Sequence, residues 1–148
     1  RDHSDLECVK EALREAGAED IRLFAKIENM DGVRKLEKLL PAADEIVIAR
    51  GDLGNAVHLW DLPGVQRQIS EKCRAAGKPF MVVTQMLASM ERSPVPTRAE
   101  VNDIFHAVMD GAASIMVTGE TAVGDYPVEV IRYMVNTVRS AEKKKIDK

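Results

Sequence analysis

Four short apolar runs in this chain each stop at a residue with a reactive side chain. The runs cover residues 21–27, 45–49, 79–83 and 113–117. The residues at or just beyond their ends are Lys26 and Glu28, Asp52, Thr84, and Thr118 beside Glu120. Parallel strands buried on both faces read as continuous apolar runs, and βα barrels carry their reactive groups where such strands end. The pattern therefore predicts a parallel βα barrel of the TIM type with a site at its strand ends.

The length limits how much of a barrel this chain can form. Its 148 residues are enough for a core but fall well short of the roughly 250 residues of a complete eight-stranded barrel. No linker or low-complexity segment divides them. We therefore expect an α/β fold in which residues 1–148 form one partial barrel domain of four strands with flanking helices.

Helix signals alternate with the apolar runs. Thr97 with Glu100, and Ser4 with Glu7, fit the S/T-x-x-E capping pattern. Prolines suited to a first helical turn stand at positions 63 and 127, and glycines suited to helix ends stand at 17, 77 and 111. These signals predict helices near residues 5–16, 30–40, 63–76, 98–110 and 127–141.

Composition excludes several classes of protein. A net charge of −3 with 30% charged residues lacks the basic excess of a nucleic-acid binder. Two cysteines do not suggest a disulfide framework, and no apolar stretch approaches the roughly 18 residues of a membrane span. We expect a cytoplasmic protein with small-molecule partners, and neither a nucleic acid nor a membrane among them.

Charged residues at the first two strand ends suggest a cation-binding surface. Lys26 and Glu28 lie two apart, so on a strand they project to the same side. Asp52 follows the neighbouring run, and with Glu28 it could give a divalent ion the one or two carboxylates that Mg²⁺ commonly takes. The alternatives are a rim salt bridge for Lys26 with Glu28, and a turn or helix-capping role for Asp52.

Small and hydroxyl residues complete the candidate site. Gly51 and Gly54 leave the backbone open to a ligand, which exposed amides could bind. Thr84 and Thr118 place hydroxyls where they could donate to a developing oxyanion or relay a proton. As isolated residues, both threonines would more often serve as a helix cap or a structural hydroxyl. The three histidines are too widely spaced to form a metal cluster, and Trp60, Met86, Leu87 and Met90 are expected to fill core or inter-loop gaps.

Six motifs in order resemble the pyruvate kinase family. They are AKIEN at 25–29, ARGDLG at 49–54, AGKP at 76–79, TQML at 84–87, PTRAE at 96–100 and TGETA at 118–122. The resemblance runs from about residue 1 to about residue 141. It implies phosphoryl transfer from phosphoenolpyruvate to ADP, giving pyruvate and ATP in glycolysis.

The resemblance also implies a role for each candidate residue. Glu28 and Asp52 would bind Mg²⁺ or Mn²⁺, while the amides of Gly51 and Asp52 would hold the substrate carboxylate. Lys26 would stabilise the transferring phosphoryl group and the enolate. Thr84 would lie near the carbon that becomes the methyl group, and Thr118, where many members carry serine, would join a proton relay.

Relative to that family, the chain resembles the back half of one barrel. Strands one to four, the nucleotide side, the lid domain, the K⁺ ligands and the C-terminal domain are expected to lie outside it. We therefore expect little or no turnover by these residues alone. Open strand edges near 21–27 and 114–117 predict self-association into a homo-oligomer, and the resemblance adds Arg98 as a link between protomers. The stretch 55–62 looks more like a bacterial version than an animal one.

Two other functions fit the same residues. A magnesium-dependent aldolase or lyase would use the same barrel and the same metal-bound enolate, and ADP dependence of turnover would distinguish it from a kinase. The other is a non-catalytic association module in which the site residues carry no chemistry.

Overall fold

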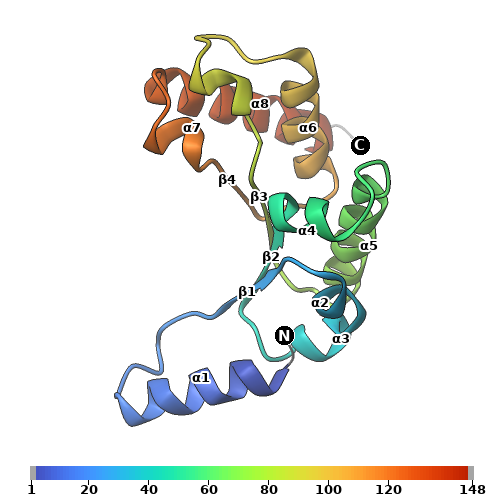
Figure 1. Ribbon diagram of the computed structural model, residues 1–148, viewed down its shortest axis with the longest axis vertical. Coiled ribbons are helices and arrows are strands. Elements are labelled where there is room, and N and C mark those ends of the chain that lie inside the picture. Colours follow the sequence, from blue (N-terminus) through green and yellow to red (C-terminus); the bar gives the residue numbers. More distant parts are fainter. Residues whose placement is uncertain (1–2, 147–148) are drawn as a thin grey trace. The chain divides into compact units, whose positions relative to one another are not determined.

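A computed structural model describes residues 3–146, which fall into two compact units, Arg1–Met81 and Val82–Lys148. Four strands form one sheet in the order β1 (Phe24–Ile27), β2 (Glu45–Ala49), β3 (Phe80–Val83) and β4 (Ser114–Met116) (Figure 1). β1 and β2 are parallel, with Lys26 opposite Val47. Spatial order equals chain order and helices fill each connection, so the predicted α/β partial barrel with a parallel sheet is confirmed.

Helices precede, connect and follow these strands (Figure 1). The first unit contains α1 (His3–Glu15), α2 (Met30–Arg34), α3 (Leu36–Leu39), α4 (Arg50–Ala56) and α5 (Leu62–Ala75). The second contains the 3₁₀ helix η1 (Ala88–Glu91), α6 (Arg98–Met109), α7 (Gly119–Ala122) and α8 (Pro127–Ile146).

Most of the predicted helix boundaries are confirmed. Thr97 caps α6 through a complete capping box, in which its hydroxyl accepts from the Glu100 amide and the Glu100 carboxylate accepts from the Thr97 amide. Gly17, Gly77 and Gly111 have φ values of 66°, 61° and 98°, a region that glycine occupies without steric cost. The cap predicted at Ser4 is wrong, because Ser4 already lies within α1.

Three local predictions differ from the structure. The helix expected over 30–40 is divided at Lys35, whose φ and ψ of −93° and 7° leave the helical region. The first strand begins at Phe24 instead of residue 21. α4 is not among the predicted helices, and its seven residues include two glycines. Leu53 on α4 is fully buried, so packing outweighs the low helix propensity of glycine there.

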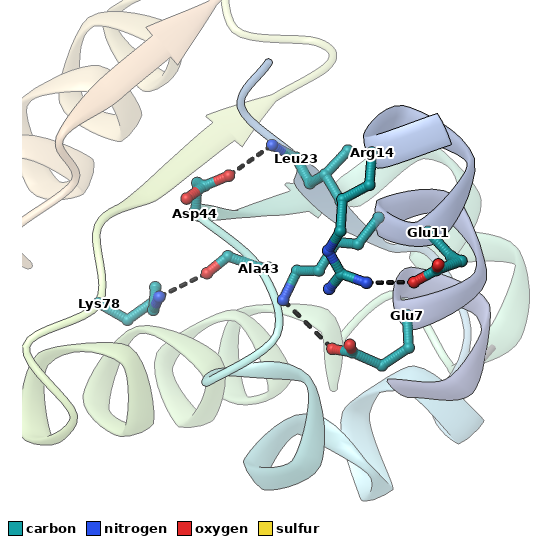
Figure 2. A network of polar contacts seen from close by, with 8 residues as sticks. Glu7, Glu11, Arg14, Leu23, Ala43, Asp44 and Lys78 are labelled. Carbon is teal, nitrogen blue, oxygen red and sulfur yellow. Dashed lines mark hydrogen bonds and ion pairs between the residues drawn. The ribbon is translucent and has the colours of Figure 1, made fainter. Parts of the chain in front are cut away.

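The first unit has its core around β2, in which all five residues are buried. β1 instead alternates, with Phe24 and Lys26 exposed, so the prediction that every run is buried on both faces is wrong for this edge strand. α1 buries no residue and carries ion pairs of Glu7 with Lys10 and Glu11 with Arg14 (Figure 2).

Polar bonds join the segments that precede β1, β2 and β3. The Leu23 amide donates to Asp44 Oδ2 at 2.6 Å, and Lys78 Nζ donates to the Ala43 carbonyl (Figure 2). Both bonds satisfy backbone groups at the end of the sheet opposite the candidate site. The candidate site residues lie at the carboxyl ends of the strands, away from these bonds.

The second unit buries apolar residues from the segment after β3, from η1 and from helices α6 and α8. Met86, Leu87, Met90 and Ile104 are fully buried. The prediction that Met86, Leu87 and Met90 fill core gaps is therefore confirmed. Trp60, in the first unit, is 78% exposed and stacks on His58. Its predicted gap-filling role is therefore wrong.

Candidate active site at the strand ends

Lys26 lies between two carboxylates in the first unit. Its Nζ is 2.7 Å from Glu28 Oε2 and 3.0 Å from Asp52 Oδ2. Lys26 is on β1, Glu28 directly follows that strand, and Asp52 follows β2. Parallel pairing of β1 with β2 brings the three side chains together, although Lys26 and Asp52 are 26 positions apart.

The cluster is open to solvent, with one ammonium group between two carboxylates. The side chains of Lys26, Glu28 and Asp52 are 52%, 44% and 54% exposed. Hydrogen bonds to Glu28 and then to Asp52 raise the pKa of Lys26 above its ordinary value. The ammonium therefore keeps its charge at neutral pH and remains available to an anionic ligand.

Asp52 occupies the third position of α4, and Gly51 the second. Ala49 precedes the helix as its N-cap residue and makes no side-chain capping bond. The Asp52 carboxylate points instead to Lys26. The alternative prediction, that Asp52 only caps a turn or helix, is therefore wrong. Gly54 has ordinary space beside it, since an added Cβ would lie 3.7 Å from Leu62 Cδ2.

The two carboxylates fit an open divalent-metal site. Both converge on the single cationic point of Lys26 Nζ, and both remain about half exposed. Mg²⁺ commonly takes one or two protein carboxylates and keeps water or substrate oxygens in its other positions. Within residues 3–146 no group of three or more His, Cys, Asp or Glu could hold a metal ion, so Glu28 and Asp52 would need further ligands from water or substrate.

Thr84 lies at a strained turn directly after β3, in the second unit. Its φ is 72° and that of Gln85 is 53°, which is costly for a β-branched side chain. The Thr84 hydroxyl donates to the Val83 carbonyl at 2.6 Å. Two consecutive residues in this region point to a functional segment, because such strain is concentrated at ligand-binding and catalytic sites.

Thr118 precedes α7 and contacts Glu120. Its amide donates to Glu120 Oε2 at 2.7 Å, and its hydroxyl lies 3.4 Å from the same oxygen. Thr118 makes no side-chain capping bond to the helix. Sequence reasoning named Glu120 only as a neighbour of Thr118 and gave it no role. No local signal shows that its other oxygen reaches Leu87, 33 positions away.

Two carboxylates of the second unit are ionised more readily than usual. Burial raises the pKa of Glu120, but hydrogen bonds from the amides of Thr118, Glu120 and Leu87 outweigh it, so the net pKa lies below 4.5. Burial likewise opposes ionisation of Glu100, and bonds from Ser89 and Thr97 bring its pKa below 4.5. Both side chains are therefore charged at neutral pH.

These depressed pKa values predict a loss of stability in acid. A carboxyl with a lower pKa in the folded state stabilises the fold above its unfolded pKa, and this contribution is lost as pH falls through the folded pKa. We expect the urea midpoint of the chain to fall below pH 4.5. Glu100→Gln should show a smaller decline over the same interval in urea titrations followed by circular dichroism. An equally steep decline in the variant would contradict the prediction.

Comparison with known proteins identifies the family. The family model for the pyruvate kinase barrel domain matches residues 1–131. This chain belongs to the pyruvate kinase family. A pyruvate kinase of Bacillus licheniformis is 45% identical over 139 residues, which cover 94% of this chain and 24% of that protein. Those of Clostridium acetobutylicum and Dictyostelium discoideum are 42% and 45% identical over 142 residues each, covering 30% and 28% of their lengths.

The chain thus spans less than a third of these pyruvate kinases. Bacterial and non-bacterial relatives match equally well, so the identities do not favour the bacterial origin suggested by residues 55–62. Residues 3–146 contain no helix long and apolar enough to cross a membrane.

Proposed function

We propose that this chain supplies the phosphoenolpyruvate and metal half of a pyruvate kinase active site, for Mg²⁺-dependent phosphoryl transfer from phosphoenolpyruvate to ADP. The observation that carries the proposal is the position of Lys26 Nζ within 3.0 Å of both Glu28 and Asp52. A fixed cation beside two strand-end carboxylates that could hold a metal ion suits a substrate that carries a phosphoryl group and a carboxylate. Membership of the family supports the same reaction.

Each residue of the Lys26 cluster has a distinct part in this proposal. Glu28 and Asp52 would hold Mg²⁺ or Mn²⁺, which when bound supplies positive charge to substrate oxygens. Gly51 and Asp52 would orient the substrate carboxylate through their amides. Lys26 would stabilise negative charge on the phosphoryl oxygens and the enolate, because a loose phosphoryl-transfer transition state is catalysed mainly by positioning and electrostatics.

The two threonines would act on the enolate carbon. In the proposed reaction the enolate gains a proton at the methylene carbon to become pyruvate. Thr84, at its strained turn, would lie near that carbon, and the hydroxyl of Thr118 would belong to the proton relay. Both hydroxyls can donate and accept, which such a relay requires.

The complete reaction extends beyond these residues. We propose that ADP and K⁺ bind parts of a longer polypeptide, that the active protein is a cytoplasmic homo-oligomer to which Arg98 contributes, and that the 148-residue chain alone has little or no turnover. The exposed side chains of Phe24 and Met116 on the outer strands, and of Ile21 shortly before β1, support self-association.

Metal titration tests the proposal on the chain itself. Removing one carboxylate ligand by Glu28→Gln is expected to weaken Mg²⁺ or Mn²⁺ binding about tenfold or more, measured by calorimetry or by electron paramagnetic resonance of free Mn²⁺. Glu37→Gln is the matched control, because Glu37 forms an exposed 2.8 Å pair with Lys72. No metal binding by the unmutated chain would favour the association module.

A further inference from the structure

Glu120 is a carboxylate almost fully removed from solvent. It lies at the second position of α7, in the second unit, and is only 2% exposed. A buried charge is costly unless it is paired or hydrogen-bonded. The partners of Glu120 therefore indicate what the structure gains from it.

The two oxygens of Glu120 bind two different loops. Oε1 accepts from the Leu87 amide at 3.1 Å, while Oε2 accepts from the Thr118 amide at 2.7 Å. Leu87 closes the turn that contains Thr84, and Thr118 is itself the second candidate hydroxyl. One side chain thus connects the backbones of both threonine loops.

The Thr84 turn needs such an anchor. Thr84 and Gln85 both have positive φ, and strained residues persist only where their surroundings over-determine them. Met86 and Leu87 immediately follow and are fully buried. With its side chain packed and its amide bound to Glu120, Leu87 holds the end of the strained turn in place.

Neighbouring contacts keep α7 against η1 and so keep Glu120 within reach of Leu87. Asp125 donates its amide to the Glu91 carbonyl at 2.9 Å, and its carboxylate accepts two bonds from Arg92 at 3.0 and 3.1 Å. An added Cβ at Gly124 would lie 3.1 Å from Glu91 Cα, which belongs to η1, and 2.4 Å from the carbonyl oxygen of Glu120 within its own segment. The close approach of these two segments therefore depends on glycine.

We infer that Glu120 is a positioning residue, which sets the Thr84 turn and Thr118 in one arrangement by binding the amides of Leu87 and Thr118. The inference rests on the proposed function, in which these threonines serve the enolate. Glu120 itself need not touch substrate. A neutral amide at this position offers one acceptor oxygen, so it can satisfy only one of the two loops.

Amide hydrogen exchange of the full chain tests the inference. In Glu120→Gln, the amide of Leu87 or Thr118 should exchange about tenfold faster or more, relative to the buried amide of Ile104. The Thr118 amide proton should also lose the downfield shift expected of a bond to a carboxylate. Glu100→Gln is the matched control, because it removes another hydrogen-bonded carboxylate of this unit and should leave both amides within twofold.

The outcomes separate this inference from the proposed function. Unchanged exchange and shifts in Glu120→Gln, or equal changes in Glu100→Gln, would overturn the positioning role. If Glu120→Gln does not fold, Glu120→Asp, whose shorter side chain cannot reach both amides, replaces it with the same expected result. Metal titration of the Glu120 variants should give the same Mg²⁺ or Mn²⁺ affinity as the unmutated chain, since Glu28 and Asp52 are unchanged. Absence of metal binding in the unmutated chain would refute the proposed function alone.

Discussion

Lys26→Met is expected to tighten divalent-metal binding while weakening phosphoenolpyruvate binding. The ammonium lies within 3.0 Å of both proposed metal ligands, so it repels a second cation and competes for the same oxygens. Removing it should raise Mg²⁺ affinity about threefold to tenfold, in line with the modest energies of exposed ion pairs. The substrate anion loses its fixed cation, and its affinity should fall about tenfold.

In a complete pyruvate kinase that contains this segment, the same variant should lower kcat by about 10²–10³, the usual cost of removing one preorganised charge-stabilising donor. Calorimetry with Mg²⁺ and then with phosphoenolpyruvate measures the two affinities. Lys72→Met is the matched control, because Lys72 forms a comparable pair with Glu37. Parallel weakening of metal and substrate in Lys26→Met would mean that Lys26 only maintains local structure.

Gly124→Ala is expected to be among the most destabilising single-methyl additions in the chain. The new Cβ would lie 2.4 Å from the Glu120 carbonyl oxygen and 3.1 Å from Glu91 Cα. Both are backbone atoms, so no side chain can move aside. Overpacking of this kind costs about 1–3 kcal/mol. The contact between α7 and η1 should open, and with it the hydrogen bond from Leu87 to Glu120.

Gly64→Ala adds the same methyl group but is expected to stabilise the chain. An added Cβ at Gly64, in the first turns of α5, meets nothing within 4 Å, and replacing a helical glycine by alanine stabilises a helix by about 0.5–1 kcal/mol. Urea unfolding followed by circular dichroism compares the two variants. Equal stability of Gly124→Ala and the unmutated chain would contradict the expected clash of the new Cβ with the backbones of Glu120 and Glu91.

Local sequence was sufficient for elements whose causes are local. The Thr97 capping box and the glycines at 17, 77 and 111 depend on residues a few positions apart. The pairing of Lys26 with Glu28 is also local, because a strand sends residues two apart to the same side. Two short helices were missed. α7 has only four residues and α4 contains two glycines, so both form through packing more than through propensity.

Contacts between segments far apart in the chain could not be predicted from local sequence. Nothing near Asp52 shows that its carboxylate meets Lys26. Likewise, positive φ at Thr84 and Gln85 contradicts their residue preferences, since neither is glycine. Such strain arises only where the rest of the fold compensates for it.

By itself the sequence determined the order of strands and helices, the family, and which residues carry charge or hydroxyl groups at the strand ends. Those properties follow from hydrophobic periodicity, capping chemistry and the residues of short motifs in a characteristic order. The tertiary structure decided which of these groups meet. It placed Lys26 between two carboxylates and buried Glu120 between Leu87 and Thr118. The bond from the Leu87 amide to the buried Glu120 carboxylate, 3.1 Å long, joins residues 33 positions apart, and no local sequence pattern encodes a contact over that separation.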